Sequence, residues 1–216
     1  MLTTGRSGST SLMAALARHP GIALPRKQID CGDDELLREH SLHAHTRQYR
    51  RLSGALITSA DELIDLFYDY NRGAPFAGFK SMPHRHKRYG DSVARPDIQA
   101  IILRRRDLAS TLASFMLATE QGIWRRAGER ASARWRFGDH NRQAALSILR
   151  NLKTNLHKLE AVADRIDLVF EDLCDRAFQD PRLDACFGRR ITIDDSRLPV
   201  SGETCTDSWD AFLTFV

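Results

Sequence analysis

The sequence predicts an α/β fold in which a parallel sheet is flanked by helices on both faces. Short apolar runs alternate along the chain with longer segments of helical spacing, and this alternation is typical of parallel sheets with crossover helices. The 216 residues are 42% hydrophobic and 28% charged, as in ordinary globular proteins. We therefore expect one domain with a sizeable core over residues 1–216.

Strands are expected wherever a short apolar run stands between polar segments. The clearest is Ile98–Leu103, an almost unbroken apolar run that suits the centre of a parallel sheet. Weaker runs predict further strands at residues 21–25, 76–80 and 166–170. Residues 1–4 form a very short first strand, so that either the start is trimmed or the strand is a stub.

Helices are expected over residues 10–18, 60–70, 108–119 and 141–163. The first stops near His19-Pro20-Gly21, where proline and glycine end helices. A terminal helix is expected over residues 208–213, with Trp209 and Phe212 as aromatic anchors.

The segment Gly5-Arg6-Ser7-Gly8-Ser9-Thr10-Ser11 lies between the first strand and the first helix. Backbone N–H groups at a helix N-terminus, together with the helix dipole, favour an anion. Glycine lets the backbone approach a ligand closely, and the hydroxyl groups add donors. Arg6 adds a fixed positive charge. These residues predict a phosphate-binding loop, and hence a P-loop-like sheet.

This loop matches neither of two common nucleotide motifs. No Gly-Lys-Ser/Thr occurs, as a Walker A loop requires, and Gly5-Arg6-Ser7-Gly8 is not the dinucleotide fingerprint. The plain alternative is an ordinary helix capped by Ser7 or Ser9. A cap alone, however, does not require two glycines, an arginine and further hydroxyl residues.

A second basic and hydroxyl-bearing segment follows the strand at residues 98–103. Arg106 would lie at the mouth of the next helix, and Ser114 about two turns along it. A guanidinium and a hydroxyl so placed could hold one phosphate from two sides. The alternative is a solvated run of charge. Because Lys80 also follows a strand, we expect all these groups at one edge of the sheet.

Taken together, the two segments resemble those of sulfotransferases that use 3′-phosphoadenosine 5′-phosphosulfate (PAPS). The resemblance implies that the first loop, residues 6–11, holds the 5′-phosphosulfate, while Arg106 and Ser114 hold the 3′-phosphate. It also implies that Arg6 neutralises charge near the bridging oxygen as the sulfuryl group leaves. Arg6, Ser7, Gly8, Ser9, Thr10, Ser11, Arg106 and Ser114 are thus the expected nucleotide-binding residues.

Further segments are similar to the bacterial carbohydrate and Nod-factor branch of that family. They are His19-Pro20-Gly21-Ile22, Lys27-Gln28, Gly78-Phe79-Lys80-Ser81 and Phe170-Glu171-Asp172-Leu173. The resemblance is weak at residues 31–76 and 175–198. It implies an enzyme that makes 3′-phosphoadenosine 5′-phosphate (PAP) from PAPS without a metal. The scattered cysteines, for their part, indicate reduced thiols and hence a cytoplasmic protein.

The position that holds a glutamate base in many carbohydrate sulfotransferases is occupied here by Gln28. A neutral amide cannot accept a proton as a carboxylate can. Asp30 is our first choice for the base because it is close in sequence, and Lys80 is expected to orient the acceptor or stabilise the transferring sulfonate. Other candidate bases are Asp33, Asp34, Glu35, His43 and His45.

We expect in-line transfer of a sulfuryl group to a hydroxyl of a small-molecule, carbohydrate or lipid-linked acceptor. Trp124, Trp135 and Phe137 are candidates for the acceptor edge. Two alternatives stay open: a kinase-like phosphotransferase, with Glu171-Asp172 as the magnesium-binding acids, and a silent PAP- or PAPS-binding homologue. The sequence also leaves open whether the protein forms a homodimer.

Net charge, cysteine spacing and hydropathy indicate which ligands and which surroundings to expect. The net charge of +4 suits an anionic ligand without indicating nucleic acid. The four cysteines form no C-x-x-C, and no apolar run is long enough to span a membrane.

Overall fold

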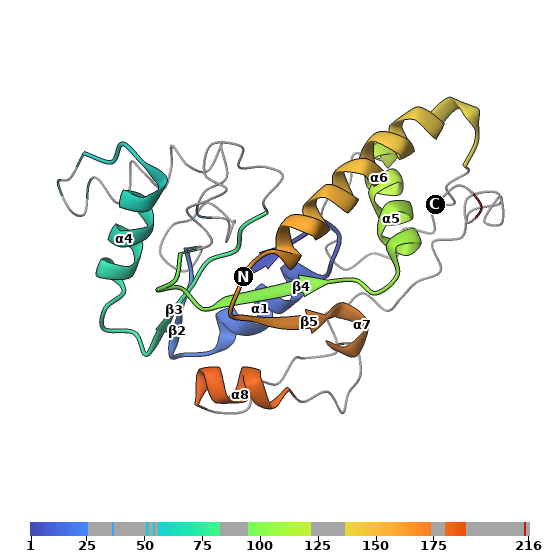
Figure 1. Cartoon of the computed structure of the whole chain (residues 1–216). Coiled ribbons are helices and arrows are strands. Elements are labelled where there is room, and N and C mark those ends of the chain that lie inside the picture. Colours follow the sequence, from blue (N-terminus) through green and yellow to red (C-terminus); the bar gives the residue numbers. More distant parts are fainter. Residues whose placement is uncertain are drawn as a thin grey trace.

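The computed structural model describes residues 1–25, 36, 51, 54, 56–82, 95–121, 137–173, 180–188 and 214. Within these ranges strands and helices alternate (Figure 1). The strands are β1 (Leu2–Thr3), β2 (Ile22–Ala23), β3 (Phe76–Ala77), β4 (Ala100–Arg104) and β5 (Arg165–Val169). The helices are α1 (Ser9–Arg18), α4 (Ala60–Tyr70), α5 (Leu108–Gln121), α6 (Asp139–Glu160), α7 (Phe170–Leu173) and α8 (Pro181–Phe187).

The described strands pair in parallel throughout. One sheet has the order β1-β4-β5, and a second pairs β2 with β3. A parallel bridge between Leu2 and Ser81 connects them, since Ser81 follows β3 by a few residues and lies beside β1. The resulting spatial order is β2, β3 with its continuation to Ser81, β1, β4 and β5.

The register brings the carboxyl ends of three strands to the same level. Thr3 pairs with Leu103, and Leu103 pairs with Leu168. The segments that follow β1, β4 and β5 therefore leave the sheet at one edge. From β1 the chain runs to β2 on one side, whereas from β4 it runs to β5 on the other. This reversal between β1 and β4 is a topological switch point, the place at which open α/β sheets bind ligands.

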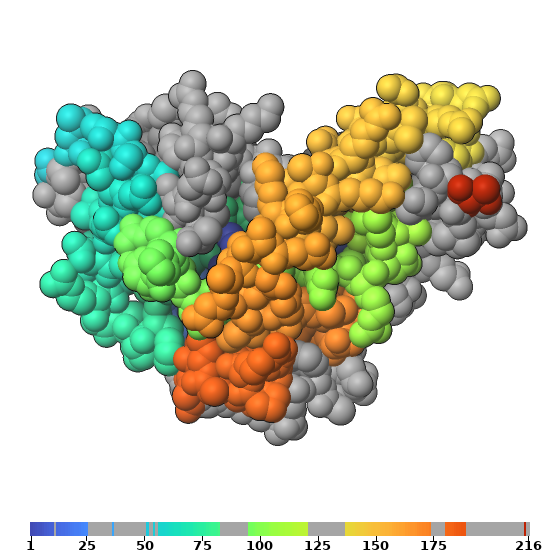
Figure 2. All heavy atoms as spheres, in the orientation of Figure 1, coloured from blue at the N-terminus to red at the C-terminus, as the bar shows by residue number. Residues whose placement is uncertain are grey.

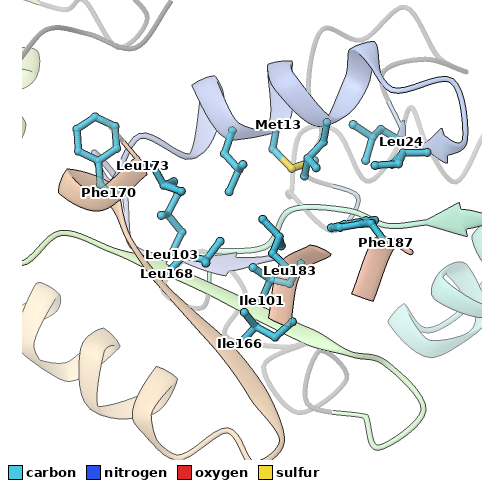
Figure 3. Close-up of a cluster of buried hydrophobic side chains, with 13 residues drawn as sticks. Met13, Leu24, Ile101, Leu103, Ile166, Leu168, Phe170, Leu173, Leu183 and Phe187 are labelled. Atoms are coloured by element: carbon cyan, nitrogen blue, oxygen red, sulfur yellow. The ribbon is translucent and has the colours of Figure 1, made fainter. Parts of the chain in front are cut away.

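Side chains of β4 alternate between the two faces of the sheet, as in any strand. Ile101 and Leu103 face a core that contains α1, α7 and α8, where Met13, Leu183 and Phe187 lie between helix and strand (Figure 3). Ala100 and Ile102 belong to a second core, which contains α4 and the end of α6. Helices thus cover both faces, as expected for an α/β fold.

The helices α5 and α6 pack against each other through a third cluster, which includes Leu112, Met116, Ala145 and Leu149. In Figure 1 they lie side by side, and α6 runs across the front of the sheet, where it forms much of the visible face in Figure 2. Because α5 is held from this side, the position of Ser114 on α5 is set by the α5–α6 contact.

Most expected elements are present, with shifted ends. The helix expected at residues 60–70 is α4 with the same bounds, and the Ser59–Glu62 capping box explains its start. The expected strand 76–80 is only Phe76–Ala77, and the strand expected to reach Phe170 ends at Val169 because α7 begins there. The helix expected over residues 208–213 lies outside the described residues.

None of the helices in the described ranges combines the length and apolar character that a membrane crossing requires.

Candidate anion-binding site

The loop between β1 and α1 is shaped by buried hydroxyl groups. Thr3 Oγ1 donates to the carbonyl oxygen of Leu103 at 2.8 Å, which ties the end of β1 to β4. Ser7 is fully buried, and its Oγ donates to the carbonyl oxygen of Thr4 at 2.8 Å. The Thr3 and Ser7 hydroxyl oxygens are in contact. The Ser7 hydroxyl therefore shapes the loop, so that Ser7 would meet an anion through its backbone N–H.

Two residues of this loop have left-handed backbone conformations. Arg6 has a φ of 62° and Gly8 a φ of 78°. Turns with such residues form concave groups of backbone N–H donors that bind anions. Gly8 is the N-cap of α1, and within the described residues no side chain caps this end and no acidic residue occupies the first turn. The N–H groups at the start of α1 are thus available in the way an anion requires.

Two aromatic rings hold the glycines of the loop. A Cβ on Gly5 would lie 2.4 Å from Cζ of Phe115 on α5, and a Cβ on Gly8 would lie 2.0 Å from Cδ2 of Phe170. Only glycine therefore allows this close packing at either position. The loop is held between α5 and the start of α7.

Arg6 reaches from the loop to α5. Its Nε–H donates to Ser114 Oγ at 2.9 Å, and both residues are half-buried. The contact spans the switch point between β1 and β4. It joins a residue of the first predicted segment to a residue of the second, although they are 108 positions apart. Ser9 is buried and Thr10 exposed at the adjacent start of α1.

Arg106 follows the end of β4 by two residues and contacts the short helix α7. Its Nη2 is 2.6 Å from Asp172 Oδ1, and its backbone N–H donates to Glu171 Oε2 at 2.9 Å. The side chain of Arg106 is 67% exposed. Ser114 thus pairs with Arg6, and Arg106 pairs with Asp172.

Arg105 supports the packing beneath the loop. Its guanidinium carbon is 4.8 Å from the centroid of the Phe170 ring, a cation–π distance. The same ring packs against Gly8. Arg105 is therefore connected to the loop through Phe170.

Lys80 is buried beside the first strand, with 6% of its surface exposed. The following residue, Ser81, accepts from the Thr3 N–H at 3.2 Å through its carbonyl oxygen. The Met1 amino group donates to the carbonyl oxygen of Phe79, and burial together with the charge of Lys80 lowers the pKa of that amino group to about 5. A buried ammonium is costly unless polar groups compensate it.

Several predicted residues lie outside the described part of the chain. They are Gln28, Asp30, Asp33, Asp34, Glu35, His43, His45, Trp124 and Trp135. For Ser11 the backbone belongs to α1, and its side chain is not described. Phe137 is described and packs against the α5–α6 cluster, which is a core role. In the described ranges no group of three or more histidine, cysteine or acidic side chains is arranged to hold a metal ion.

Two residues of the site have no role in the sequence-based predictions. Phe115 and Phe170 hold the loop glycines, yet each is distant from them in sequence. Neither close approach has a local signal in the sequence, because each ring is far from its glycine along the chain.

Comparison of the chain with protein-family models, with curated proteins and with solved structures finds no match.

Proposed function

We propose that this chain is a PAPS-dependent sulfotransferase with a P-loop-like fold, which transfers a sulfuryl group to an acceptor hydroxyl. The observation that carries the proposal is the hydrogen bond from Arg6 Nε to Ser114 Oγ at the switch point between β1 and β4. It joins the two segments that the resemblance assigns to the two ends of one nucleotide. The spatial strand order and the reversal between β1 and β4 support the P-loop-like assignment.

The residues suit an anion with two separated charged groups. The start of α1 and Arg6 offer N–H donors and a positive charge at the end of β1. Arg106 offers a second, exposed guanidinium beyond the end of β4. PAPS and PAP carry charge at both the 5′ and the 3′ positions, so each basic group has a partner.

In the proposed reaction the acceptor oxygen forms a bond to sulfur, and the bond between sulfur and the bridging phosphate oxygen breaks. The acceptor proton passes to a base, and PAP leaves. Charge builds up on the oxygens around sulfur, so catalysis is mainly positioning and electrostatic stabilisation, as in phosphoryl transfer. Arg6 would stabilise the leaving oxygen, and Lys80 would orient the acceptor or stabilise the sulfonate. Asp30 remains the proposed base.

A kinase-like phosphotransferase is the competing proposal. It requires acidic groups for a magnesium ion at a strand end, where Glu171 and Asp172 are the candidates. Both of their carboxylates contact Arg106. The Asp172 carboxylate pairs with the Arg106 guanidinium, and Glu171 accepts from the Arg106 backbone N–H. Because both carboxylates already have partners within the chain, we favour the sulfotransferase.

Calorimetric titration separates these functions. We expect PAP to bind the wild-type protein and ATP with magnesium to bind far more weakly. Ser114→Ala should weaken PAP binding about tenfold, since a hydrogen bond to a charged group is removed. Thr119→Ala is the matched control, because it removes another hydroxyl from the same helix, one that donates to the carbonyl oxygen of Phe115. Absence of PAP binding would overturn the proposal.

Turnover then distinguishes an enzyme from a silent binding protein. The wild-type protein is incubated with PAPS and a panel of sugar, lipid and phenol acceptors, and PAP release is measured. Arg6→Gly should abolish release, because it removes the guanidinium while its flexible backbone accepts the positive φ at this position. PAP binding without turnover on any acceptor would favour the silent homologue, consistent with glutamine at position 28.

A further inference from the structure

The short helix α7 contacts Arg106 through two adjacent acidic residues. The pairing of Arg104 with Val169 in the β4–β5 register brings the segment after β4 beside the segment after β5. As a result, Glu171 accepts from the backbone N–H of Arg106, and Asp172 pairs with its guanidinium at 2.6 Å. The two carboxylates thus have different roles. Glu171 binds the backbone of Arg106, and Asp172 binds its guanidinium.

The Arg106–Asp172 ion pair is exposed, so that Arg106 can exchange Asp172 for another anion. The Arg106 and Asp172 side chains are 67% and 46% exposed. Water and salt screen such exposed pairs, so breaking one has a small effect. A phosphate dianion offers a guanidinium several oxygens and more charge than a carboxylate does, and it binds arginine in a bidentate manner. An incoming phosphate can therefore displace Asp172.

The three consecutive arginines differ in this respect. Arg104 has Glu160 at 4.0 Å and is 41% exposed, and Arg105 stacks on Phe170 beneath the loop. Arg106 is more exposed than Arg104, and its guanidinium pairs with a carboxylate at the ligand edge of the sheet. Arg105 is held by its contact with Phe170, and Arg106 is the most exposed arginine with a short ion pair at the ends of the strands.

We infer that Asp172 is a competing carboxylate that occupies Arg106 when no nucleotide is bound and that the 3′-phosphate displaces it. This inference rests on the proposed function and adds a residue that tunes it. Because Asp172 competes for Arg106, it weakens the binding of every ligand that contacts this guanidinium. A ligand with a single negative charge at Arg106 competes least well with the carboxylate. The pair also re-forms when PAP leaves, which favours product release.

The test compares Asp172→Asn with the wild-type protein by calorimetric titration of PAP, of adenosine 5′-monophosphate and of inorganic phosphate. Loss of an exposed ion pair predicts about two- to fivefold tighter PAP binding. Adenosine 5′-monophosphate lacks the 3′-phosphate, so its affinity should not change. The gain should vanish in the Arg106→Ala background, where Arg106→Ala and the double variant should bind PAP equally.

Glu171→Gln is the charge-matched control. It removes the same unit of negative charge one residue away, and its amide oxygen can still accept from the Arg106 N–H. The PAP affinity of Glu171→Gln should therefore rise clearly less than that of Asp172→Asn.

Weaker PAP binding by Asp172→Asn would overturn the inference, because Asp172 would then position Arg106 for the ligand. An equal gain for adenosine 5′-monophosphate or for Glu171→Gln would overturn it as well, since the effect would be one of general charge. If no nucleotide binds any variant, the proposed function fails. The titration with inorganic phosphate then tests the role of Asp172 by itself. A gain in phosphate affinity that depends on Arg106 supports the competing carboxylate, and no gain or no phosphate binding overturns it.

Discussion

The Nε–H of Arg6 donates to Ser114 Oγ at 2.9 Å, so that the loop after β1 and the helix after β4 form one site. The bond is made by a residue with a φ of 62°, a conformation that non-glycine residues rarely adopt. The guanidinium thus reaches α5 from a residue whose backbone conformation favours glycine.

The strain at Arg6 can be measured by comparing two substitutions. Arg6→Gly and Arg6→Ala both remove the guanidinium and its bond to Ser114, but only glycine accepts a positive φ freely. We expect Arg6→Gly to unfold with a free energy about 1 kcal/mol higher than Arg6→Ala. Urea denaturation followed by circular dichroism provides the measurement. Equal stabilities would show that the left-handed conformation is not retained in solution.

The contact between Gly8 and Phe170 predicts a large effect of Gly8→Ala. The new Cβ would lie 2.0 Å from the ring, and φ is 78°. We expect a loss of about 2–4 kcal/mol, from overpacking and from backbone strain together. Gly188→Ala is the matched control, because its φ is 62° and no atom lies within 4 Å of its Cβ. Gly188→Ala should lose only the backbone contribution, about 1 kcal/mol.

The contact between Gly5 and Phe115 predicts compensation between two substitutions. In Gly5→Ala the new Cβ meets the tip of the Phe115 ring at 2.4 Å, which should cost about 1–3 kcal/mol. Phe115→Leu removes that tip, so Gly5→Ala should cost much less in the Phe115→Leu background. A double-mutant cycle in urea should yield a coupling energy of at least about 1 kcal/mol. Additive effects would contradict the close packing.

The acid stability of the protein should depend on Asp180. Asp180 caps α8 and pairs with Arg182 at 2.7 Å, and this guanidinium lowers the pKa of the carboxyl below its ordinary value of 3.8. Because the folded pKa lies below the unfolded one, the stabilisation is complete above the unfolded pKa. It is lost as pH falls through the folded pKa.

Asp180→Asn tests this pH dependence, since asparagine retains a capping oxygen and loses the charge. We expect the variant to be about 1–2 kcal/mol less stable at pH 7, because charge-assisted hydrogen bonds are lost. The difference should shrink as pH falls below the ordinary carboxyl pKa of 3.8, because the wild-type carboxyl then takes up its proton. Thermal unfolding at several pH values measures it, and a difference independent of pH would assign the effect to capping alone.

Local signals account for the elements that could be predicted from the sequence. The bounds of α4 follow from its capping box and its apolar face, and the run at residues 98–103 predicted β4 within two residues at its start. The loop between β1 and α1 was predicted from its glycines and hydroxyl groups. Such features depend on neighbours a few residues away, so the sequence determined them by itself.

Tertiary structure alone decided how these parts meet. The Arg6–Ser114 bond, the Phe170 ring on Gly8 and the Asp172–Arg106 pair join residues far apart in the chain. The strand order and the shared level of the strand ends bring them together, and local periodicity encodes neither. The sequence therefore determined which chemical groups stand at the sheet edge, whereas the packing of β1, β4 and β5 decided which groups are partners.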